Sequence, residues 1–65
     1  MSHGNCLKIA LIRANKSQIE LAAEVDVKRQ QVGVWCRSAR FSESVMKKVL
    51  AVFDMKESEF VALGE

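Results

Sequence analysis

Apolar residues recur along the chain at intervals of three and four positions, the spacing that gathers them on one face of a helix. In residues 6 to 14 this apolar face consists of Leu7, Ala10, Leu11 and Ala14. Residues 15 to 17 interrupt the pattern, so we expect the first helix to end there. Ser17 and Glu20 then have the spacing of a capping box, which predicts a second helix starting at Gln18.

A new apolar phase begins soon after the second predicted helix. Its members are Val27, Val32 and Trp35, out of register with Leu21, Ala22 and Val25 before them. Asp26 lies at the change of phase, and aspartate tolerates left-handed backbone better than most residues other than glycine. We therefore expect a tight turn at Asp26 and a third helix from about Lys28 to Ser38.

The remaining residues predict two more helices. Ser42 is a candidate N-cap for residues 43 to 53, whose apolar positions are Val45, Met46, Val49, Leu50 and Phe53. Asp54 and Glu57 repeat the capping-box spacing and predict a short fifth helix that Gly64 would end. No segment needs a strand, so the predicted fold is all-α, a compact domain of five helices.

Composition narrows the class of protein. The chain has 65 residues, 49% of them hydrophobic and 28% charged, which predicts a single globular domain over residues 1 to 65. No apolar run approaches the roughly 18 residues of a membrane span, so we expect a cytoplasmic protein without a membrane partner. Residues 1 to 5 are expected to be disordered, with Met1 to Gly4 either a native end or an added tail.

The chain lacks the residue clusters that catalysis or metal binding requires. Cys6 and Cys36 lie far apart with a single histidine, His3, so we expect two reduced, partly buried thiols and no zinc site. No nucleophile with a base, acid–base pair or metal cluster is evident, which argues against an enzyme. We expect no cofactor and no small-molecule ligand.

Charge is unevenly distributed along the sequence. Residues 28 to 48 hold six basic residues against Glu43 alone, a local charge of +5, whereas residues 54 to 65 hold four acidic residues against Lys56, a local −3. A basic segment of this kind is typical of a surface that neutralises phosphates.

The second and third predicted helices have the lengths and the short connection of a helix-turn-helix, about residues 17 to 38. Counted from Gln18, the fifth, tenth, fifteenth and eighteenth positions are the small or apolar anchors Ala22, Val27, Val32 and Trp35. The segment SQIELAAEVDVKRQQVGVWCRS resembles the Xre/Cro family of bacterial and phage repressors, and the resemblance extends from about Leu7 to Leu63. The family usually has glycine in place of Asp26, serine or threonine in place of Lys28, and a longer link between the first two helices.

The resemblance implies a phage-repressor-like fold and a role for individual residues. It places Ser17 and Gln18 on phosphates. It assigns base readout to Arg29, Gln30, Gly33 and Val34. It also implies that the loop residues Arg40 and Phe41 approach the DNA backbone.

Helical periodicity supports this assignment independently, because turning Val32 and Trp35 inward turns the four base-reading candidates outward. Arginine recognises guanine, glutamine recognises adenine, and Val34 suits a thymine methyl. Glycine at position 33 lowers helix stability by about 1 kcal/mol relative to alanine. A backbone that must approach DNA closely would explain why glycine is present there. The residues expected to flank the groove and bind phosphates are Lys28, Gln31, Arg37 and Arg40. Gln31 is equally consistent with solvent exposure. Lys47 or Lys48 could also flank the groove, and the alternative for both is a solvated helix face.

These features predict a sequence-specific regulator that binds double-stranded DNA, a Cro-type phage or prophage repressor on a pseudo-palindromic operator. A homodimer is expected, with Phe60, Val61 and Leu63 as its surface, or else these residues cover the core and pairing occurs only on DNA. A restriction–modification controller or host regulator is an alternative within this class. The alternative of another class is an antitoxin-like or antirepressor-like module that binds a protein.

Overall fold

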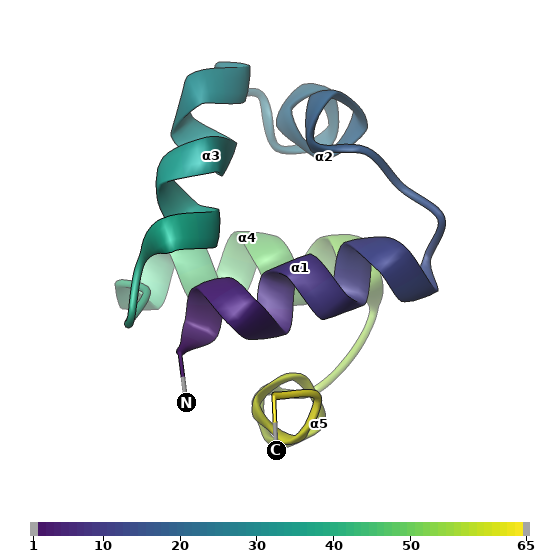
Figure 1. The fold of residues 1–65 in the computed structure, drawn as a ribbon, viewed down its shortest axis with the longest axis vertical. Helices are drawn as coiled ribbons and strands as arrows, with labels where there is room; N and C mark the ends of the chain where they lie inside the picture. The colour runs from purple at the N-terminus through teal and green to yellow at the C-terminus, as the bar shows by residue number, and fades with distance from the viewer. Residues whose placement is uncertain (1, 65) are drawn as a thin grey trace.

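Helices make up all the regular secondary structure of residues 2 to 64, the part of the chain that the computed structural model describes (Figure 1). The five helices are α1 (His3–Arg13), α2 (Gln18–Val25), α3 (Arg29–Arg37), α4 (Glu43–Phe53) and α5 (Glu57–Ala62). This confirms the all-α, five-helix prediction.

The first helix starts earlier than its apolar pattern predicts. Ser2 is the N-cap of α1, and its hydroxyl oxygen accepts a hydrogen bond from the Asn5 amide at 3.1 Å. Residues 2 to 5, which we expected to be disordered, therefore form the cap and first turn of α1, and that expectation was wrong for them. Met1 lies outside the described residues.

The helix-turn-helix forms as its capping residues predict. Ser17 accepts a hydrogen bond from the Glu20 amide at 3.1 Å, and its own amide donates to the Glu20 carboxylate at 2.9 Å. Asp26 ends α2 in the left-handed conformation, with φ of 57° and ψ of 50°. The amides of Asp26 and Val27 both donate to the Ala22 carbonyl, so the turn is closed by the backbone of a small, buried residue of α2.

The link between α4 and α5 corrects one prediction. Asp54 does not cap α5; it ends α4 in the left-handed conformation with φ of 52°. The N-cap of α5 is Lys56, whose amide donates to the Glu59 carboxylate at 3.0 Å. The residue that ends α4 adopts a positive φ, which aspartate tolerates better than most residues other than glycine. Asp54 therefore ends α4 and is not available to cap α5. Gly64 is not left-handed, and Leu63 is the C-cap of α5.

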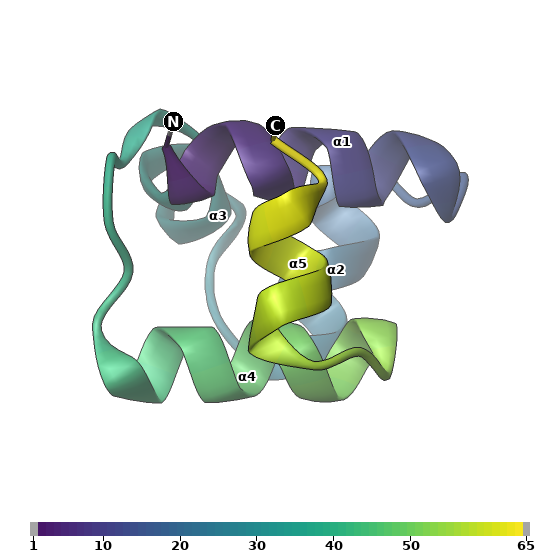
Figure 2. The same ribbon diagram turned by 90° about the horizontal axis from the view of Figure 1, so that it is seen from below.

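The helices enclose one core: α1 and α4 cross the middle of the domain, α2 and α3 lie on one side of this pair, and α5 lies on the opposite side (Figure 1). Figure 2 shows α5 lying across both α1 and α4. The buried hydrophobic residues are Cys6, Leu7, Ala10, Leu11, Leu21, Ala22, Val32, Trp35, Cys36, Met46, Val49 and Phe60. The acidic residues of α5 thus lie on the side of the domain opposite the helix-turn-helix.

Candidate nucleic-acid interface

Helix α3 has one buried face and one exposed face. Val32, Trp35 and Cys36 are buried in the core, which confirms the expectation that Trp35 is a core residue. On the other face Arg29 and Gln30 are exposed, Gly33 is half-buried, and Val34 remains 45% exposed although it is a large apolar residue. The four predicted base readers are therefore presented together on the face that a partner can reach.

The amino end of α3 lacks the devices that usually stabilise a helix start. Its N-cap, Lys28, makes no capping hydrogen bond through its side chain, and its first turn contains no acidic residue. Each of the other four described helices has a capping serine, acidic residues in its first turn, or both. Lys28 and Arg29 also place positive charge at the positive end of the helix dipole, which is unfavourable. This arrangement weakens the helix start and suits the binding of an anion.

Neither packing nor backbone strain requires glycine at position 33. A Cβ atom there would come no closer than 3.5 Å to Arg37 Nη1 and 3.9 Å to Gln18 Oε1, which is ordinary contact. Its φ is not positive. Arg37 therefore extends back along α3 past Gly33, toward the start of α2. The glycine brings two predicted phosphate-binding side chains close to the same point.

The amino end of α2 contributes less than the sequence predicts. Ser17 and Gln18 are both exposed, but the amide and hydroxyl of Ser17 are engaged in the capping box with Glu20. Hydrogen bonds from the Ser17 amide and hydroxyl hold the pKa of Glu20 below its usual range, so a carboxylate occupies part of this helix end. Gln18 is left as the better placed of the two for contact with a phosphate.

The two predicted DNA contacts in the α3–α4 loop, residues 38 to 42, differ in how they are placed. Arg40 is exposed. Phe41 instead packs inward, with its ring centroid 6.4 Å from that of Trp35 and 6.1 Å from that of Phe60. Phe41 is half-buried, and its ring helps to anchor the loop on two aromatic side chains. Its contact with the DNA backbone stays a prediction.

Two residues that bear on this loop were missed from the sequence. His3 Nδ1 accepts a hydrogen bond from the Phe41 amide at 2.8 Å, and the amides of His3 and Gly4 donate to the carbonyls of Ala39 and Ser38, both at 2.9 Å. Ser2 at the N-cap position, three residues before Asn5, is a local signal that could have extended α1 to these residues.

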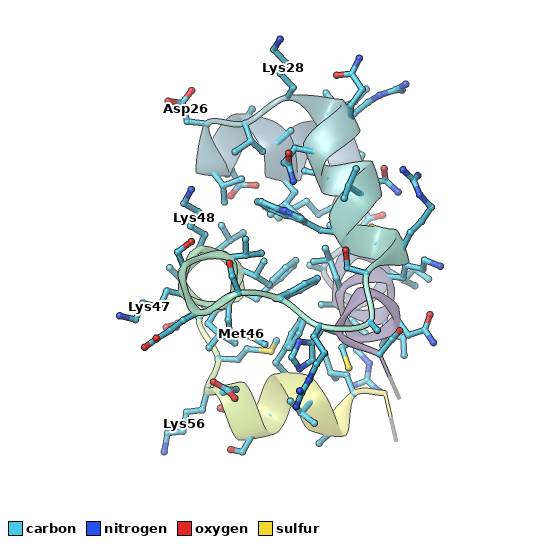
Figure 3. All side chains as sticks on the ribbon, turned by 90° about the vertical axis from the view of Figure 1, so that its left-hand side faces the viewer. Asp26, Lys28, Met46, Lys47, Lys48 and Lys56 are labelled. Carbon is cyan, nitrogen blue, oxygen red and sulfur yellow. The ribbon has the colours of Figure 1, made fainter. Side chains whose placement is uncertain are left out.

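The structure also places the residues of two other predicted surfaces, the lysines of α4 and the apolar residues of α5. Figure 3 shows Lys47 projecting from α4 away from the helix-turn-helix, whereas Lys48 points toward the end of α2 and lines a groove with Glu24 and Val25. Both lysines are exposed, which fits the alternative of a solvated helix face. Phe60 is fully buried, so its assignment to a dimer surface was wrong, and the alternative that it covers the core holds. Val61 and Leu63 are half-buried.

Other chemistry is sparse on the described residues. Cys6 and Cys36 are free and buried, and burial raises the pKa of the Cys36 thiol. Between residues 2 and 64 there is no cluster of three or more metal-ligating side chains. No helix in the same range is both long and apolar enough to cross a membrane.

A model of a helix-turn-helix family matches residues 7 to 60, which includes all of α2, α3 and α4. Comparison with curated proteins and with solved structures gave no match. The matched family consists of DNA-binding regulators and is generally non-enzymatic. The match covers most of the chain and includes the exposed face of α3 together with its buried anchors. The chain therefore belongs to the Xre-type helix-turn-helix family of DNA-binding regulators.

Proposed function

We propose that the protein is a Cro-type repressor of a phage or prophage that inserts α3 into the major groove of a pseudo-palindromic operator. The observation that carries the proposal is the uncapped, basic start of α3, followed by an exposed face with the base-reading candidates. Arg29 and Gln30 lie in the first turn, the part of a recognition helix that reaches base edges. Arginine and glutamine each discriminate one base by about 1–3 kcal/mol.

Phosphate contacts on both sides of α3 would fix its register. Lys28 and Gln31 lie at its amino end, Gln18 and Arg37 beside Gly33, and Arg40 beyond its carboxyl end. Backbone contacts of this kind contribute affinity that does not depend on sequence and that falls steeply with salt. We propose that the protein acts in the bacterial cytoplasm, on nucleoid DNA.

We propose that two copies bind one operator and that pairing takes place on the DNA. One α3 offers few base contacts, and helix-turn-helix proteins commonly occupy two half-sites about one turn of DNA apart. Because Phe60 is buried, only Val61 and Leu63 of the predicted apolar dimer surface remain accessible, and both are half-buried. Sedimentation should therefore show a monomer in free solution and two copies per operator. One copy per operator would contradict the dimer.

The first test is selection of bound duplexes from a random DNA pool at moderate salt, followed by sequencing. We expect a palindromic consensus whose half-site centres lie about one helical turn apart. Arg29→Ala should then cost about 1–3 kcal/mol and relax preference at one or two base pairs, whereas Arg40→Ala should weaken all sequences alike. Lys47→Ala serves as the matched cation control, because Lys47 projects from α4 away from the helix-turn-helix (Figure 3). Equal losses on operator and random DNA from Arg29→Ala would contradict base readout.

The second candidate is a protein-binding module, and one observation favours it. Ile12 and Ile19 are 78% and 60% exposed. Ile12 lines an open groove between the end of α1 and the start of α2, next to Leu11 and Lys16. Failure of the DNA selection to enrich any sequence, with the protein folded, would favour this function over operator binding.

A further inference from the structure

The α3–α4 loop is attached to the start of α1 at three backbone groups. The carbonyls of Ser38 and Ala39 accept hydrogen bonds from the amides of Gly4 and His3, and the Phe41 amide donates to His3 Nδ1. Arg40 lies between the second and third of these attachments. Its backbone is therefore held on both sides while its side chain remains exposed.

These hydrogen bonds pair backbone amides at the start of α1 that would otherwise need water or a capping side chain as partner. The first four amides of a helix have no partner within the helix. In α1 the amides of His3 and Gly4 donate to the α3–α4 loop, and the amide of Asn5 donates to the Ser2 hydroxyl. The amide of Cys6 makes the first regular helical bond, to the Ser2 carbonyl. The loop therefore pairs the first two amides of α1, which makes the contact part of the structure of both segments.

Packing makes the contact specific for the residues that form it. A Cβ atom on Gly4 would lie 2.4 Å from the Cys36 carbonyl oxygen and 2.8 Å from that of Ser38, so only glycine allows this approach. The imidazole of His3 packs on Phe41 with a centroid distance of 5.3 Å and lies 6.4 Å from Phe60. His3 therefore holds the loop through both an acceptor nitrogen and an aromatic face.

We propose that His3 and Gly4 are positioning residues for DNA binding, which lock the α3–α4 loop so that Arg40 is held ready for a phosphate. The proposal rests on the proposed function. Residues 3 and 4 precede the segment that the family model matches, so the lock belongs to this chain's own amino end. Holding the loop in advance reduces the conformational entropy lost when Arg40 binds. Since Arg40 contacts backbone, losing the lock should weaken binding to every sequence alike.

The test uses two substitutions at His3 that separate its two contributions. His3→Phe retains a ring against Phe41 and removes the acceptor, whereas His3→Asn places a carbonyl oxygen near the position of Nδ1. We expect His3→Phe to weaken binding to a short random-sequence duplex by about three- to tenfold, the worth of one hydrogen bond. His3→Asn should recover most of that loss. Amide hydrogen exchange at Phe41 should speed up in His3→Phe and not in His3→Asn.

A double-mutant cycle with Arg40→Ala distinguishes positioning from general stabilisation. If His3 acts through Arg40, His3→Phe should change DNA affinity by less than about twofold once Arg40 is absent. Additive losses in the cycle, or unchanged exchange at Phe41 in His3→Phe, would overturn the positioning role and leave the proposed function intact. A folded wild-type protein with no affinity for DNA would overturn both. His3→Leu also removes the acceptor and replaces His3→Phe in the cycle should that variant not fold.

Discussion

Replacing Gly33 with alanine tests whether this position is kept for DNA or for the fold. In the free protein the added methyl group would lie 3.5 Å from Arg37 Nη1 and 3.9 Å from Gln18 Oε1, both at the ends of flexible side chains. The backbone φ is not in the left-handed region, so the substitution introduces no strain. The structure therefore accepts alanine at this position.

The expected effect on stability follows from helix propensity alone. Alanine is favoured over glycine in a helix interior by about 0.8–1.0 kcal/mol. Because α3 contributes the buried residues Val32 and Trp35, its stabilisation is transmitted to the whole domain. The free energy of unfolding of Gly33→Ala should rise by about 1 kcal/mol, and Tm by about 4–8 °C for a domain of this size.

Gly4→Ala is the matched control, since it makes the same chemical change in another helix. Its methyl group would meet the carbonyl oxygens of Cys36 at 2.4 Å and Ser38 at 2.8 Å, and both are backbone atoms that cannot rotate away. We expect Gly4→Ala to lower the free energy of unfolding by about 1–3 kcal/mol, as other overpacked sites do. The two substitutions should thus move the urea midpoint in opposite directions.

Operator binding by Gly33→Ala decides the functional question. If glycine allows close approach to DNA, the methyl group should weaken operator binding by about tenfold or more, equivalent to about 1.4 kcal/mol, in a protein that is more stable than wild type. Fluorescence anisotropy on the selected operator measures the affinity. A variant that is stabilised and binds as tightly as wild type would refute the close-approach argument. A destabilised variant would refute the description of α3.

Three further predictions concern the helix-turn-helix. Lys28→Ser should supply the missing cap, raising the free energy of unfolding by about 0.5–2 kcal/mol while reducing the salt slope of DNA binding by about one; urea titration without a gain would contradict the uncapped start. The lowered pKa of Glu20 means that its ionised carboxylate stabilises the fold above the usual glutamate range, and this contribution is lost as the pH falls through the lowered pKa. The urea midpoint of wild type should therefore fall more steeply in acid than that of Glu20→Gln, and parallel curves would contradict this. Ala22→Leu should destabilise the domain by about 1–3 kcal/mol or unfold it, because Ala22 is buried in the core; a stable variant that binds DNA normally would disprove the packing.

Local signals in the sequence were sufficient to predict most of the fold. Apolar spacing placed the first four helices, and the pairing of Ser17 with Glu20 and the cap at Ser42 fixed the starts of α2 and α4. The fifth helix was predicted from the capping-box spacing of Asp54 and Glu57. These features act within one or two turns of chain, which is why they can be recognised without tertiary information. Asp54 shows the limit, because the same residue type suits both an N-cap and a left-handed helix end.

The errors arose where distant segments meet. Phe60 looked like a surface residue next to acidic neighbours, but it closes the core from the far side of α1. Phe41 looked like part of a basic loop, but it packs on Trp35. Residues 1 to 5 were expected to be disordered, but the amides of His3 and Gly4 donate to carbonyls of the α3–α4 loop. None of these contacts leaves a periodic pattern, so spacing could not reveal them.

The support of α3 is concentrated away from its amino end, the end that we propose contacts DNA. Its amino end, at Lys28, has no capping side chain and an unfavourable charge, so the start of the helix contributes little to its own stability. Its middle is held by the burial of Val32 and Trp35, and beyond its carboxyl end Ser38 is bound by Gly4. Departures from local stability rules tend to occur at functional sites. By this argument the weakly supported start of α3, rather than its well-packed carboxyl end, is the part of the domain reserved for DNA.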